Sequence, residues 1–95
     1  MNKEEYLIYC LFYAIDAANV KKQNLVQMAL KTDSVCFVKI YNLIQQQDEA
    51  TRKNIITTIQ NNFDKNELIE EIKNTFLLEL ETSVQENIVE VLSLF

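Results

Sequence analysis

The sequence contains no glycine, no proline and no histidine among its 95 residues, and these absences exclude whole classes of function. Glycine-rich loops bring backbone N–H groups onto phosphates, so neither a Walker loop nor a dinucleotide-binding fingerprint can be written here. Histidine is the commonest metal ligand, and its ordinary pKa is near neutrality, so most catalytic triads, zinc sites and pH switches are excluded as well. We therefore expect a protein that is not an enzyme and that uses no metal and no cofactor.

The length and composition are typical of one folded domain, with 48% hydrophobic and 24% charged residues, so residues 1–95 are expected to form a single domain. Cys10 and Cys36 lie in apolar runs and are too few for the disulfide framework of a small secreted protein, which favours buried thiols. The apolar run Tyr6–Ile15 is too short for a membrane span, and Glu4 and Glu5 before it have the wrong sign for a secretion signal. We expect a cytoplasmic protein with no membrane partner.

Apolar residues recur every three or four positions, which predicts an all-α fold of five to six short helices. The first covers about Lys3–Ala18 and is apolar nearly all round, which indicates a central position or a face covered by a partner. The residues expected to begin or end helices are Asn19, Asp33 or Ser34, Asp48, Asn61–Asn62, Asp64 with Glu67, and Thr82 with Gln85 or Ser83 with Glu86. The apolar positions include Leu25, Val26, Met28 and Leu30 in the second helix, and the stripes Phe37, Ile40, Tyr41 and Ile44, then Ile55, Ile56, Ile59 and Phe63, then Ile69, Ile72, Phe76 and Leu80, and finally Val84, Ile88, Val91 and Phe95.

Three segments share a polar residue, an asparagine and two aliphatic residues: Gln23–Val26, Lys53–Ile56 and Glu86–Val89. Their offsets of 30 and 33 residues are typical of repeats made of helical hairpins. In period and pattern the chain resembles HEAT-like repeats over about residues 3–95, although it lacks their typical proline and arginine positions. Two architectures are open: three stacked helical hairpins, or an irregular helical bundle.

The formal net charge of −5 is distributed unevenly along the chain. Residues 1–63 hold seven Lys and Arg against six Asp and Glu, whereas residues 64–95 hold two Lys against eight acids, a net charge of −6. Concentrated negative charge accelerates the encounter with a basic partner and adds specificity. The candidate partner-binding acids are Glu67, Glu70, Glu71, Glu86 and Glu90. The other interpretation of these residues is a solvated face.

Three of the four tyrosines, Tyr6, Tyr9 and Tyr13, share one face of the first predicted helix. Tyrosine combines a large contact area with a polar tip, which suits an interface, but an aromatic stripe at helical spacing also suits a core. The basic residues are dispersed along the chain, so nucleic-acid binding is not expected.

These features favour a non-enzymatic inhibitor or immunity protein that neutralises a basic partner, such as a nuclease toxin, through an acidic C-terminal helical hairpin. The competing hypothesis is a structural or adaptor module of helical repeats that binds a peptide or helix, or that forms a homodimer through its first helix. Mimicry of DNA by spaced carboxylates is a third possibility. The sequence determines neither the partner nor the oligomeric state.

Overall fold

The computed structural model describes residues 2–31 and 34–94, which are helical throughout apart from short connections, so the predicted all-α class is confirmed. The helices are α1 (Lys3–Ala18), α2 (Lys22–Ala29), α3 (Ser34–Gln46), α4 (Glu49–Asn62), α5 (Lys65–Ile72), a π-helical turn η1 (Lys73–Leu77) and α6 (Thr82–Ser93). Within the described residues, no helix combines the length and apolar content that crossing a membrane requires.

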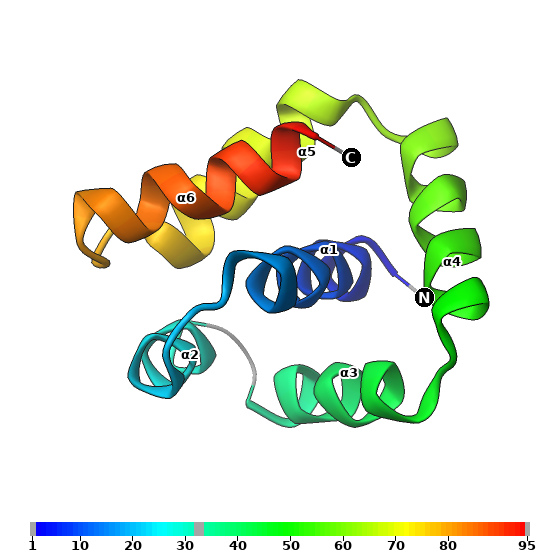
Figure 1. The fold of residues 1–95 in the computed structure, drawn as a ribbon, viewed down its shortest axis with the longest axis horizontal. Coiled ribbons are helices and arrows are strands. Elements are labelled where there is room, and N and C mark those ends of the chain that lie inside the picture. The colour runs from blue at the N-terminus through cyan, green and yellow to red at the C-terminus, as the bar shows by residue number, and fades with distance from the viewer. Residues whose placement is uncertain (1, 32–33, 95) are drawn as a thin grey trace.

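Helix α1 lies at the centre of the molecule, and α3, α5 and α6 pack against it (Figure 1). Its buried residues are Leu7, Ile8, Tyr9, Cys10, Leu11, Phe12, Ala14 and Ile15. A helix with apolar side chains nearly all round can bury them only if it has neighbours on several sides. The central position expected for this segment is therefore what the structure shows.

Of the two architectures that the sequence left open, the structure shows the irregular bundle. In a row of stacked hairpins each helix packs mainly on its neighbours in the chain, whereas α1 packs against α3, α5 and α6. The three repeated asparagines also differ in their bonding. The side-chain amide of Asn87 donates to the carbonyl of Ala18 at 3.1 Å, the backbone N–H of Asn24 donates to Lys21, and the carbonyl of Asn54 accepts from Thr58.

Several helix ends are where the sequence predicted them. Asn19 adopts the left-handed conformation (φ 58°) that ends α1, a conformation which asparagine tolerates better than most residues. The carboxylates of Asp48 and Asp64 accept from the backbone N–H groups of Thr51 and Glu67, at 2.7 and 3.1 Å. Short polar side chains thus begin and end helices in a chain that has no glycine or proline for these positions.

The start of α6 differs from the prediction. Neither Thr82 nor Ser83 is its N-cap, because the helix begins after Glu81 and has no side-chain cap. Gln85 instead donates through its side-chain amide to the carbonyl of Leu80 at 2.8 Å, which gives this carbonyl, just before α6, a hydrogen-bond partner. The predicted cap before α3 lies partly outside the described residues, since Asp33 is not described and Ser34 is the first residue of α3.

The predicted fifth helix is also not uniform, because α5 ends at Ile72 and continues as the π-helical turn η1 before the chain turns at Leu80. The predicted stripe is nevertheless largely buried, with Ile72, Phe76 and Leu80 in the core. Phe95 lies outside the described residues.

Two predicted apolar positions of α2, and one of α3, do not lie in the core. Met28 is the fully buried residue of α2, whereas Val26 and Leu30 are 61% and 78% exposed. Tyr41 of α3 is 43% exposed. A helix of eight residues that contacts the bundle on one side has no neighbour to cover its outer face, so Val26 and Leu30 face solvent.

Candidate interaction surfaces

The candidate glutamates of α5 differ in exposure and in their ion pairs. Burial of Leu68 and Ile72 fixes the rotation of α5 and leaves Glu67 and Glu70 exposed. Glu71 is half-buried and accepts a hydrogen bond from the ammonium of Lys3 at 2.8 Å. This bond, and the negative charge of Glu71, raise the pKa of Lys3. The charge of Glu71 is therefore largely balanced within the molecule.

The candidate glutamates of α6 lie on its solvent side. Ile88 and Leu92 are buried, which leaves Glu86 and Glu90 exposed one helical turn apart. Neither carboxylate forms an ion pair within residues 2–31 and 34–94. We call Glu67, Glu70, Glu86 and Glu90 together the acidic surface.

Two lysines from the first half of the chain pair with other acidic residues of its C-terminal part. Lys31, which follows α2, pairs with Glu79 after η1, just as Lys3 pairs with Glu71. Asp64 is engaged as the N-cap of α5. The carboxylates of the acidic surface thus form no ion pair with the described residues, although the charge of Glu67 also raises the pKa of Lys3.

The three tyrosines of α1 do not form one exposed face. Tyr9 has no exposed surface, and its hydroxyl donates to the side-chain oxygen of Gln47. Burial raises the pKa of Tyr9. Tyr6 is half-buried against Phe63, with ring centroids 5.5 Å apart. Tyr13, in the C-terminal half of α1, is also half-buried. A side chain without exposed surface cannot contact a partner directly, so Tyr9 belongs to the core.

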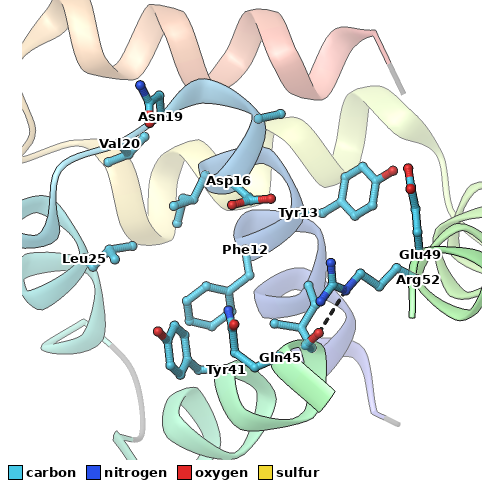
Figure 2. Close-up of a pocket in the computed structure, with 13 residues that line it drawn as sticks. Phe12, Tyr13, Asp16, Asn19, Val20, Leu25, Tyr41, Gln45, Glu49 and Arg52 are labelled. Atoms are coloured by element: carbon cyan, nitrogen blue, oxygen red, sulfur yellow. Dashed lines mark hydrogen bonds between the residues drawn. The ribbon is translucent and has the colours of Figure 1, made fainter. Parts of the chain in front are cut away.

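A groove of about 560 Å³ opens between α1, α3, α4 and the start of α2. Its walls include Phe12, Tyr13 and Asp16 of α1, Tyr41 and Gln45 of α3, and Glu49 and Arg52 of α4 (Figure 2). The rings of Phe12 and Tyr41 meet edge to face at 5.4 Å. We call this hollow the α1–α3–α4 groove. Sequence reasoning missed it because its walls come from four helices, although an acidic residue in the last turn of α1 is an unusual local signal.

Exposed large apolar side chains gather on α2 and α3. Val26 projects from α2 and Leu30 follows the end of this helix, and Val35, Val38 and Tyr41 recur at every third position of α3. Isolated exposed apolar residues are normal in proteins, whereas a contiguous apolar patch on the surface is typical of interaction sites. These residues are a second candidate surface.

Of the two cysteines, Cys10 is buried and Cys36 is half-buried. Burial raises the pKa of Cys10 to about 12, which keeps its thiol protonated and poorly nucleophilic at neutral pH. In the part of the chain that the structure describes, no group of three or more Cys, Asp and Glu side chains is placed to hold a metal ion.

Comparison with known proteins gave no match of the chain to a protein-family model or to a curated protein, and no match of the structure to a solved structure.

Proposed function

We propose that this chain is a non-enzymatic protein-binding domain that recognises a basic protein through the acidic surface. The observation that supports the proposal is the exposure of Glu67, Glu70, Glu86 and Glu90 without an ion pair in the described chain. Uncompensated carboxylates slightly destabilise a helix when they lie one turn apart, as Glu86 and Glu90 do. Their presence on α6 therefore favours a role outside the stability of the helix.

An inhibitor or immunity protein uses such a surface to cover the working face of its target. A nuclease toxin has a positive cleft for phosphates, and an acidic protein surface that enters the cleft excludes the substrate. Electrostatic attraction acts mainly before contact, within roughly 10 Å at 0.1 M salt, so it accelerates association and makes the rate sensitive to salt.

A second function is supported by the exposed apolar residues of α2 and α3. An adaptor module, or a homodimer, uses apolar contact rather than charge. Since α1 is enclosed by α3, α5 and α6, the apolar interface in this alternative consists of Val26 on α2, Leu30 at its end, and Val35 and Val38 on α3.

Two charge-matched variants distinguish the acidic surface from net charge. The triple variant Glu70→Gln, Glu86→Gln and Glu90→Gln removes three negative charges from the acidic surface. The control variant Gln23→Lys, Gln27→Lys and Gln46→Lys adds three positive charges at exposed positions of α2 and α3. Both variants have the same net charge, so a difference between them depends on where the charge lies.

The wild-type protein and both variants are used to capture partners from the native cell, and association rates with the purified partner are then measured at several salt concentrations. We expect a basic partner, with association about tenfold slower for the glutamine variant and little changed for the lysine control. Equal rates for the two variants would contradict the proposal. Binding that is lost only in Leu30→Asp and Val38→Asp favours the adaptor function instead.

A further inference from the structure

The end of α1 combines two sources of negative charge. Asp16 lies in the last turn of this helix, near the negative end of the helix dipole, and this turn contains no basic residue. The Asp16 side chain is exposed, and the described residues give it no hydrogen bond and no ion pair. The arrangement is unfavourable for the isolated helix, and a bound cation would relieve it.

Aromatic rings line the groove beside this carboxylate. Phe12 and Tyr13 of α1 and Tyr41 of α3 contribute to its walls, and Figure 2 shows Asp16 above Phe12 and Tyr41 and level with Tyr13. The face of an aromatic ring attracts cations, and its surface also accommodates the methylene groups of a long side chain. The α1–α3–α4 groove therefore places aromatic rings beside a carboxylate, among polar side chains such as Gln45 and Arg52.

The positive charge in the wall of the groove is that of Arg52. The Nε of Arg52 donates to the carbonyl of Ile44 at 2.9 Å. The pKa of Asp48 is held below its ordinary value by hydrogen bonds from Thr51 and also by the charge of Arg52, so these two charges interact. Glu49 lies 3.5 Å from the ammonium of Lys53.

Since the charges of Arg52 and Asp48 act on each other and Glu49 is paired with Lys53, the remaining charge in the wall of the groove is the negative charge of Asp16. A long cationic side chain matches this charge and the aromatic walls. Arginine fits better than lysine, because a planar guanidinium both stacks on aromatic rings and binds a carboxylate through two parallel hydrogen bonds.

We propose that the α1–α3–α4 groove receives an arginine side chain of the protein partner. The guanidinium pairs with the carboxylate of Asp16, and the methylene groups lie against Phe12 and Tyr41. A groove of about 560 Å³ is within the usual range for ligand sites and leaves room for the backbone that carries the side chain. This assignment rests on the proposed function, since it requires a basic protein as partner, but it concerns a site separate from the acidic surface.

The test uses N-acetyl-L-argininamide as the probe and N-acetyl-L-citrullinamide as its uncharged control, and both are titrated into the labelled protein and followed by backbone amide NMR. We expect the arginine compound to shift the amides of the groove, with a dissociation constant on the order of 1 mM, and the citrulline compound to shift them little. Equal shifts from both compounds would overturn the assignment.

Two variants locate the charge that the probe recognises. Asp16→Asn removes a negative charge from the negative end of a helix, so its fold is expected to be at least as stable as that of the wild type. We expect this variant to bind the arginine compound about tenfold more weakly, and Glu81→Gln, at an exposed position outside the acidic surface, to bind it as the wild type does. Unchanged binding by Asp16→Asn overturns the assignment, as do shifts centred on the acidic surface. The probe titration tests the groove without the partner. A negative result would therefore overturn the groove assignment alone, and the charge-matched variants would still test the acidic surface.

Discussion

The burial of Tyr9 leads to a quantitative prediction that separates a core tyrosine from an interface tyrosine. In Tyr9→Phe the ring remains, and the hydrogen bond to Gln47 is lost. Gln47 is half-buried, so water can reach its side-chain oxygen, and the expected loss of unfolding free energy is about 0.5–1.5 kcal/mol. In Tyr9→Ala the whole ring is lost from a site with 0% exposure, and the expected cost is about 3–5 kcal/mol.

Domains of this size are stabilised by only about 5–14 kcal/mol, so the alanine variant loses a large part of the total. Urea unfolding followed by far-UV circular dichroism measures both losses. The Phe variant is expected to melt about 4–8 °C lower for each kcal/mol that it loses. Since the hydroxyl and the ring contribute separately, the Ala variant should be less stable than the Phe variant by several kcal/mol.

The matched control is Tyr41→Ala in α3, because this ring is 43% exposed and its loss should cost far less than the loss of Tyr9. The reasoning is refuted if Tyr9→Ala unfolds within 1 kcal/mol of the wild type, or if it costs no more than Tyr41→Ala. Loss of self-association by a stably folded Tyr9→Ala would support the interface interpretation that the burial of this ring opposes.

Two further predictions concern the ends of helices. The folded pKa of Asp48 lies below its ordinary value, so its stabilisation is fully present above the unfolded pKa and is lost as the pH falls through the folded pKa. Asp48→Asn keeps a capping side chain, so its stability at neutral pH should be similar to that of the wild type. Urea midpoints of the variant should fall less steeply than those of the wild type between about pH 5 and pH 2. Parallel curves for both proteins would count against this assignment. Asn19 has a φ of 58°, so Asn19→Ala should lose about 1 kcal/mol while Asn19→Gly loses nothing or gains slightly. Thermal unfolding measures the difference, and equal melting temperatures of the Ala and Gly variants would contradict the role given to this residue.

Local features of the fold could be read from the sequence. The bounds of α1 agree with its apolar periodicity, and Asn19, Asp48 and Asp64 end or begin helices as expected, because capping depends on residues three or four positions apart. The predicted N-cap of α6 was wrong for a related reason. Thr82 and Ser83 have capping side chains, but Gln85 closes the preceding turn, and this choice depends on how residues 78–81 pack.

Features that depend on contacts between helices could not be predicted. The similarity of the segments around Asn24, Asn54 and Asn87 reflects the common pattern of amphipathic helices, whereas the bond from Asn87 to Ala18 exists only after α6 has packed beside the end of α1. The pairing of Glu71 with Lys3 has the same origin. Periodicity shows which residues prefer burial, but it does not show which charges will meet or which helices will leave a groove between them.

The central position of α1 has a consequence for the order of folding during synthesis. This helix is made before the helices that cover it, and the chain must extend from Ala18 to Ser93 before α6 is complete. At about 5–20 residues per second, this takes roughly 4–15 s. During that interval the apolar residues of α1 lack part of their final cover and are open to chaperones or to other nascent chains. The yield of folded protein in the cell therefore depends on how quickly α6 is synthesised as well as on the stability of the finished fold.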